Sequence, residues 1–216
     1  MSSSNSEAAI PARFAVVIAA STGGPRALAQ LIPQLDSPFR AAVLVVQHMP
    51  SPFTHALAKR LDALSAIEVL EARHAEAVLE GKVYFAPGGR HMRVTGTSGG
   101  ARLCLDEEAE LWGVRPAADH LFRSAAAVFG PGTVGVVMTG MGRDGADGLE
   151  AVVAAGGIGV AQDRQSSVVY GMPQAAAGIA HRVLPLDHIA NEINVRIGEM
   201  HVPDRVSRQT SMEDNA

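Results

Sequence analysis

Short apolar segments alternate with longer amphipathic ones along most of this chain. The β-rich apolar segments cover about residues 15–20, 42–46, 134–138 and 158–161. Stretches with helical periodicity, rich in Ala and Leu, lie between most of them. This alternation is typical of βαβ units, because two parallel strands of one sheet need a long crossover connection, which is usually a helix. The sequence therefore predicts an α/β fold of the doubly wound type, with a mostly parallel β-sheet flanked by helices.

The middle third of the chain has a different pattern. Short β-rich runs at residues 83–87, 91–94 and 102–105 are joined by Gly-rich turns, without a helical stretch between them. Strands joined by such turns usually pair antiparallel. We therefore expect a short antiparallel hairpin region in this third, with the run at 83–87 as one of its strands.

The length and composition fit one domain with a large apolar core. The chain has 216 residues, of which 47% are hydrophobic and 19% charged, and we find neither an internal repeat nor an interdomain linker. Both ends are polar and aperiodic, which favours disorder. We expect a disordered N-terminal tail over residues 1–12, a folded catalytic domain over 13–200 and a flexible C-terminal tail over 201–216.

Several protein classes are disfavoured by composition. No stretch approaches the roughly 20 apolar residues of a membrane-spanning helix, and the N-terminal sequence lacks the pattern of a secretory signal. The single cysteine, Cys104, cannot form an internal disulfide, which favours a reducing compartment. The formal charge of −4 comes without a dense Lys/Arg cluster, so we expect no nucleic-acid partner. These features predict a cytoplasmic protein that is not inserted in a membrane.

Three of the apolar segments end in residues of a hydrolytic triad. The first runs into Ser21-Thr-Gly-Gly, the second into Gln47-His48, and the third into Thr139-Gly-Met-Gly-Arg-Asp144. In an open parallel sheet, residues just beyond the carboxyl ends of the strands share one crevice. Ser21, His48 and Asp144 are therefore expected to converge there, which suggests a serine hydrolase. The histidines show no metal-ligand spacing, so we expect no metal site.

Each of these residues, taken alone, also has a structural interpretation. Ser21 or Thr22 could cap the following helix or belong to a phosphate-binding turn. His48 could be a hydrogen-bonded structural residue, and Asp144 could be the N-cap of the helix that follows it. The two glycines of Thr139-Gly-Met-Gly, in contrast, suit a loop whose backbone N–H groups stabilise an oxyanion. The residues by themselves leave these alternatives open.

The motifs together resemble those of a known family. They are Ser21-Thr-Gly-Gly-Pro, Val46-Gln-His-Met-Pro, Phe85-Ala-Pro-Gly-Gly-Arg-His, Val114-Arg-Pro-Ala-Ala-Asp, Thr139-Gly-Met-Gly-Arg-Asp-Gly-Ala and Val169-Tyr-Gly-Met-Pro. Their order, from about Phe14 to Ile193, resembles that of the CheB-type chemotaxis methylesterases. The resemblance implies hydrolysis of glutamate γ-methyl esters on methyl-accepting chemoreceptor helices, with release of methanol. Family members often also deamidate receptor glutamines.

Carried over position by position, the resemblance implies a role for six residues. Ser21 corresponds to the nucleophile, His48 to the general base, and Asp144 to the residue that orients the imidazole. Thr22, Met141 and Gly142 correspond to the residues that bind the substrate carbonyl and its oxyanion. No metal or cofactor is implied.

The chain departs from the family pattern at two points. Family members usually carry an N-terminal receiver domain, whereas only about a dozen residues precede the first expected strand here. We therefore expect no attached receiver, and activity that is either constitutive or controlled by a separate receiver protein. In addition, Ala19 stands where the family usually has Gly, a small change that should leave the turn intact.

Three other functions remain as alternatives at this stage. A non-catalytic module could keep the fold and bind a receptor or a response regulator. A serine esterase or amidase could act on a different substrate with the same residues. Nucleotide binding ranks last, because the Gly-rich loops lack a Gly-Lys-Ser/Thr motif.

Overall fold

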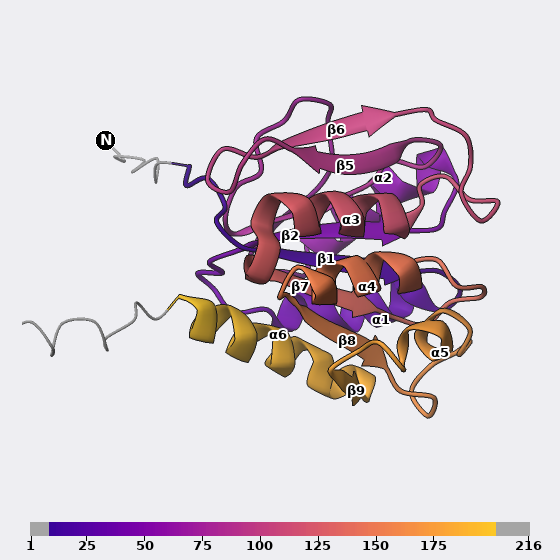
Figure 1. Ribbon diagram of the computed structural model, residues 1–216. Coiled ribbons are helices and arrows are strands. Elements are labelled where there is room, and N and C mark those ends of the chain that lie inside the picture. Colours follow the sequence, from indigo (N-terminus) through magenta and orange to yellow (C-terminus); the bar gives the residue numbers. More distant parts are fainter. Residues whose placement is uncertain (1–8, 202–216) are drawn as a thin grey trace, which may run out of the picture.

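A seven-stranded β-sheet forms the centre of the structure, a computed structural model that describes residues 9–201 (Figure 1). The strand order is β3-β4-β2-β1-β7-β8-β9, and every pairing is parallel. The strands are β1 (Ala15–Ala20), β2 (Ala42–Gln47), β3 (Glu68–Glu71), β4 (Lys82–Phe85), β7 (Thr133–Val137), β8 (Ile158–Gln162) and β9 (Arg182–Leu184). All residues of β1, β2 and β7 are buried. This burial explains their continuous apolar sequences, since parallel sheets are covered on both faces.

Helices cover both faces of the sheet, as predicted for a doubly wound fold (Figure 1). The helices are α1 (Gly24–Leu31), α2 (Ser51–Asp62), α3 (Ala118–Phe129), α4 (Ala146–Ala154), α5 (Met172–Ala176) and α6 (Leu186–Met200). Two short 3-10 turns, Ile32–Gln34 and Gly130–Gly132, follow α1 and α3. Val16 and Ile18 of β1 pack with α1, α2 and α6, whereas Val17 and Ala19 pack with α3, α4 and α5. The alternation follows from the strand geometry, in which successive side chains point to opposite faces.

The antiparallel hairpin predicted for the middle third is present but smaller than expected. β5 (His91–Thr95) and β6 (Arg102–Asp106) form a separate antiparallel pair, and Val94 and Leu103 pack in the same apolar cluster as α3. The expectation that the run at 83–87 joins this hairpin is wrong, because β4 pairs parallel with β2 and β3 in the main sheet. A short apolar run does not reveal its partners, and here the connection through α2 and β3 places β4 beside β2.

The folded part begins earlier than the expected boundary at residue 13. The N–H of Ala12 donates to Val78 O, the carbonyl of Ile10 accepts from Glu80 N, and Ala12 is fully buried. The rest of the predicted N-terminal tail, residues 1–8, and all of the C-terminal tail beyond His201 lie outside the described residues. Within residues 9–201, no helix has the length and apolarity needed to cross a membrane.

Candidate active site

The order of the central strands brings the segments of Ser21, His48 and Asp144 to one edge of the sheet. These residues follow β1, β2 and β7, and β1 pairs with both of the others. The pairing continues past the strand ends, since His48 N donates to Ala20 O and Ser21 N donates to Thr139 O, both over 3.0 Å. The Ser21 turn therefore lies between the His48 segment and the Thr139 loop, as the sequence predicts.

Ser21 occupies a tight turn from β1 into α1. Its carbonyl accepts the N–H of Gly24 over 2.8 Å, and the N-cap of α1 is Gly23, with φ +85°. The cap makes no side-chain hydrogen bond, so neither Ser21 nor Thr22 caps this helix through its hydroxyl. The turn presents the serine at the positive end of the α1 dipole, which favours developing negative charge.

The backbone of this turn is held by Gln47, the last residue of β2. Gln47 Nε2 donates to Ser21 O over 3.0 Å and to His48 O over 3.1 Å. The side chain is 2% exposed. Gly24 leaves room for it, because a Cβ at Gly24 would lie 1.9 Å from Gln47 Oε1. A buried amide thus connects the two segments that carry the candidate nucleophile and base.

His48 and Asp144 form a direct hydrogen bond. His48 Nε2 lies 2.7 Å from Asp144 Oδ2, and the two side chains are 11% and 2% exposed. A carboxylate at this distance orients an imidazole and stabilises its protonated form. The structure shows no hydrogen bond between the side chains of Ser21 and His48, and Nδ1 is the ring nitrogen that Asp144 leaves free.

Asp144 is held by a helix other than the one it precedes. Its Oδ2 accepts the N–H of Ala118 over 2.6 Å, and its Oδ1 accepts the N–H of Asp119 over 3.0 Å. Both donors belong to the first turn of α3. An anion at a helix N-terminus is stabilised by unpaired N–H groups and by the helix dipole. Asp144 thus binds the start of α3 with both oxygens while one of them also contacts His48.

The alternative that Asp144 is the N-cap of α4 is wrong. The N-cap of α4 is Gly145, with φ +92° and no side-chain cap bond. The side chain that binds the start of α4 is Asp119, whose Oδ1 accepts from Gly145 N over 3.0 Å and from Gly148 N over 2.6 Å. Its Oδ2 accepts from Trp112 Nε1 over 2.7 Å. Burial raises the pKa of Asp119, although its bonds from Trp112 and Gly148 act in the opposite direction.

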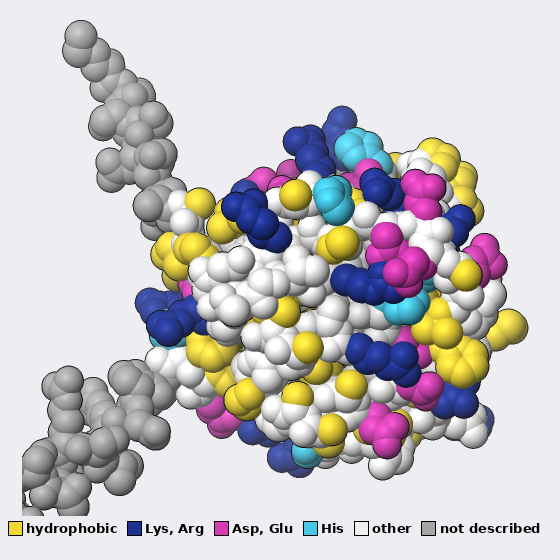
Figure 2. All heavy atoms as spheres, turned by 45° about the horizontal axis from the view of Figure 1, so that its top comes forward, with side chains coloured by type: hydrophobic (Ala, Val, Ile, Leu, Met, Phe, Trp, Pro, Cys, Tyr) yellow, Lys and Arg dark blue, Asp and Glu magenta, His cyan; other side chains and the backbone are white. Residues whose placement is uncertain are grey.

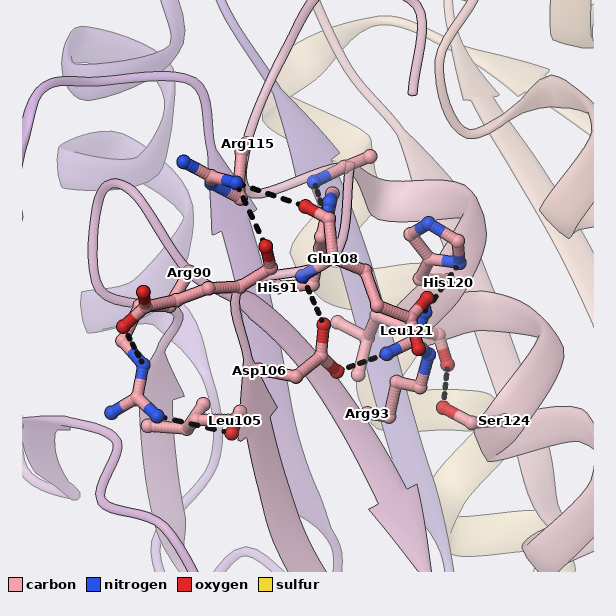
Figure 3. Close-up of polar contacts among 12 residues, drawn as sticks. Arg90, His91, Arg93, Leu105, Asp106, Glu108, Arg115, His120, Leu121 and Ser124 are labelled. Carbon is pink, nitrogen blue, oxygen red and sulfur yellow. Dashed lines mark hydrogen bonds and ion pairs between the residues drawn. The ribbon is translucent and has the colours of Figure 1, made fainter. Parts of the chain in front are cut away.

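The segment before α3 is anchored by His91 of β5 and by its own Arg115, which binds the chain just after β6 (Figure 3). The buried His91 accepts the N–H of Ala117 at Nδ1 and contacts Ala109 O through Nε2, both over 3.1 Å. Arg115 Nη1 donates to the carbonyls of Glu107 and Glu108 over 3.0 and 2.9 Å. These contacts hold the N–H groups that bind Asp144 in a fixed position.

The remaining candidate residues lie around Ser21. Thr22 is exposed, and its carbonyl accepts the hydroxyl of Thr139 over 2.9 Å. Met141 is 73% exposed, and Gly142 has φ +92°. Gly140 packs directly on the serine, because a Cβ there would lie 2.8 Å from Ser21 Cβ. The structure thus brings the Thr139-Gly-Met-Gly loop against the candidate nucleophile.

The Ser21 turn borders a cavity, and the molecular surface carries charges of both signs. A cavity of about 590 Å³ is lined by Gly23, by Val168 and by the first turn of α6. Ser21, His48 and Asp144 do not line this cavity. On the face shown in Figure 2, basic and acidic side chains are interspersed.

The chain is similar to known proteins over most of its length. The family model described as CheB methylesterase matches residues 16–193. The chain belongs to the CheB methylesterase family. This CheB-type domain resembles the crystal structure of the Thermotoga maritima CheB methylesterase catalytic domain with a TM-score of 0.82 and 41% identity. The match covers 84% of this chain and 97% of that one.

Two curated relatives carry the name protein-glutamate methylesterase/protein-glutamine glutaminase. The relative from Pyrococcus abyssi is 50% identical over 193 residues, which cover 88% of this chain and 52% of the relative. The one from Pyrococcus horikoshii is 50% identical over 186 residues, covering 85% and 50%. The CheB-type chain thus spans about half the length of the curated relatives it matches.

Two residues of this CheB-type site were missed by the sequence analysis. In the sequence, Gln47 stands out only as the neighbour of His48, and Asp119 only as the last residue of the motif Val114-Arg-Pro-Ala-Ala-Asp. A signal for Gln47 was available, because it is a polar residue at the end of a strand that is otherwise apolar. For Asp119 no local signal exists, since its partners on α4 lie more than twenty residues away.

Proposed function

We propose that this chain hydrolyses glutamate γ-methyl esters of chemoreceptors and releases methanol. The observation that carries the proposal is the His48–Asp144 hydrogen bond of 2.7 Å beside the Ser21 turn. In a chain of the CheB methylesterase family, this arrangement matches the roles of base, orienting carboxylate and nucleophile.

In the first step, His48 removes the hydroxyl proton of Ser21 as Oγ attacks the ester carbonyl. Nδ1 takes the proton, because Nε2 donates to Asp144. The tetrahedral intermediate collapses as the imidazolium returns the proton to the methoxide, and methanol leaves. Water, activated by the same imidazole, then attacks the acyl-serine and releases the glutamate side chain.

The proposed oxyanion donors are backbone N–H groups near Met141 and Thr22. The N–H groups of Thr22, Met141 and Gly142 have no acceptor among the described residues, whereas Gly140 N already donates to Val169 O over 2.9 Å. Such a donor is worth about 3 kcal/mol of barrier when it points at the developing charge. Thr22, Met141 and Gly142 are therefore proposed to bind the substrate carbonyl.

The proposed substrate segment is a receptor helix. Phe53, at the start of α2, is 59% exposed, and Met141 is 73% exposed. They belong to the segments that follow β2 and β7, which also carry His48 and Asp144. Exposed apolar side chains at this position suit an amphipathic helix that presents its ester to the serine. We further propose that the reaction takes place in the cytoplasm and that a separate receiver protein controls it.

The same residues support a second reaction, deamidation of glutamine. An amide carbonyl can be attacked by Ser21 in the same way, with ammonia leaving in place of methanol. The printed names of the two Pyrococcus relatives include protein-glutamine glutaminase. Ammonia release from unmethylated receptor would reveal this activity separately.

The proposal is tested by methanol release from methyl-esterified chemoreceptor membranes, with Ser21→Ala alongside. We expect release by the wild type and a loss of about 10³-fold or more in Ser21→Ala. Wild-type rates in Ser21→Ala would contradict the nucleophile assignment. Labelling of Ser21 by a fluorophosphonate without methanol release would indicate an esterase or amidase with another substrate. Receptor binding with neither labelling nor hydrolysis would indicate a binding module.

A further inference from the structure

Asp119 and Asp144 bind the N-termini of each other's helices. Asp119 is the second residue of α3, yet its carboxylate accepts two N–H groups at the start of α4. Asp144 directly precedes the N-cap of α4, yet its carboxylate accepts two N–H groups at the start of α3. Four hydrogen bonds of 2.6 to 3.0 Å therefore cross between the two helices.

This arrangement restrains Asp144 from two sides. Its side chain is bound to α3 directly, while its backbone is next to Gly145, which Asp119 binds. A shift of α4 relative to α3 would stretch bonds at both carboxylates at once. The helices are in close contact here, since a Cβ at Gly148 would lie 2.6 Å from Phe122 Cβ and 3.1 Å from Asp119 Oδ1. A side chain at position 148 would therefore push α3 and α4 apart.

The hydrogen-bond partners of Asp119 are matched to a group that accepts on both of its oxygens. All three of its hydrogen-bond partners, namely Gly145 N, Gly148 N and Trp112 Nε1, are donors. A carboxylate accepts on both oxygens, whereas an amide would place its NH₂ against at least one of these donors. The site therefore requires Asp and tolerates Asn only in part.

Trp112 completes the connection on the outer side. Its indole N–H donates to Asp119, and the guanidinium of Arg143 lies 4.7 Å from its ring centroid. Arg143 immediately precedes Asp144. The loop that carries Trp112 is held from its other end by Arg115 and His91 (Figure 3). Asp119 thus connects an anchored loop to the backbone that carries Asp144.

We propose that Asp119 is a positioning residue that holds Asp144 at hydrogen-bond distance from His48. The inference rests on the proposed hydrolase function for its kinetic consequence, but its structural content is independent of the substrate. Asp119 acts through the start of α4 and through Asp144, and it touches neither Ser21 nor the ester.

The test compares Asp119→Ala and Asp119→Asn with Asp147→Asn. Asp147 is the matched control, because it also lies in the first turn of α4 but pairs with the exposed Arg143 and Arg123. Two quantities are measured for each variant. The first is kcat and KM for methanol release, and the second is hydrogen exchange at individual backbone amides of the substrate-free protein.

We expect kcat of Asp119→Ala to fall about 10- to 100-fold with KM within about twofold, as for loss of an outer support of a catalytic group. Amide exchange should accelerate at Ala118 and at residue 119, whose acceptor, Asp144, is unchanged in this variant. Asp119→Asn should lie between wild type and Asp119→Ala, and Asp147→Asn should match wild type in both quantities.

A structural role of Asp119 in α4 alone predicts a different pattern. Exchange would then accelerate only at Gly145 and Gly148, the amides that lose their own acceptor. Unchanged exchange at Ala118 and residue 119 would overturn the proposal whatever the activity. If Asp119→Ala does not fold, Asp119→Asn decides on the same two amides. Absence of methanol release from the wild type would refute the proposed function, while the exchange measurement would still test the positioning.

Discussion

Gln47 donates a hydrogen bond from its side-chain Nε2 to the carbonyl oxygen of Ser21, over 3.0 Å. The same nitrogen donates to the carbonyl of His48 over 3.1 Å. The candidate nucleophile and base are thus positioned by one buried amide as well as by the pairing of β1 with β2. This contact fixes the backbone of both segments without involving either reactive side chain.

Gln47→Met should weaken both the fold and the proposed activity. Methionine has a similar size but cannot donate a hydrogen bond, so the carbonyls of Ser21 and His48 each lose the bond from residue 47. The Ser21 carbonyl keeps its bond from Gly24 N. We expect the free energy of unfolding to fall by about 1–3 kcal/mol and kcat to fall by about tenfold or more. Chemical denaturation and methanol release measure the two effects. Gln30→Met, an exposed position on α1, is the control, and equal behaviour of the two variants would contradict this role.

Gly140→Ala should disturb the serine directly. The added Cβ would lie 2.2 Å from Met172 Sδ and 2.8 Å from Ser21 Cβ, so Ser21 and Met172 cannot both keep their places. A misplacement of about 1 Å can cost about 10²-fold in rate. Gly178→Ala is the control, because its Cβ meets nothing within 4 Å. The rate of fluorophosphonate labelling of Ser21 gives the comparison, and similar rates in both variants would show that Gly140 does not hold the serine.

Asp144→Asn should impair both catalysis and stability. Its two carboxylate oxygens accept from Ala118 N, Asp119 N and His48 Nε2, and an amide must present its NH₂ to at least one of these donors. We expect the free energy of unfolding to fall by about 1–3 kcal/mol and kcat to fall by about 10⁴-fold. Thermal denaturation and methanol release test this pair of effects. If Asp144→Asn keeps full stability but loses activity, the hydrogen bonds between Asp144 and the start of α3 contribute little to the free energy of unfolding.

Tyr84 should make the stability depend on alkaline pH. Burial raises the pKa of Tyr84 to about 12, above the usual tyrosine value of about 10, and the hydroxyl donates to Ala77 O over 3.0 Å. The folded state holds this proton more tightly than the unfolded state, so the stabilisation is complete below pH 10. It is lost as the pH rises from 10 towards 12, by about 1.4 kcal/mol per pH unit. Denaturation of Tyr84→Phe at pH 9 and pH 11 should show a smaller loss than wild type, and an equal loss would exclude Tyr84 as the cause.

Much of the architecture could be predicted from local patterns. The continuous apolar runs at β1, β2 and β7 indicated buried parallel strands, and polar residues directly after them indicated the edge where a site forms. The direction of β4 and the existence of β9 could not be predicted, because three to five residues carry no information about the strand they will pair with.

For the candidate site, the sequence by itself determined which residues are present and which strand each one follows. Parallel pairing then brings Ser21, His48 and Asp144 to one edge, since the carboxyl ends of neighbouring parallel strands coincide. Only the tertiary structure decided where their remaining hydrogen bonds go. Asp144 binds the start of α3 and Asp119 binds the start of α4, because the two helices meet side by side and each presents unpaired N–H groups to the other's carboxylate. Such partners are set by how helices pack, which no local stretch of sequence specifies.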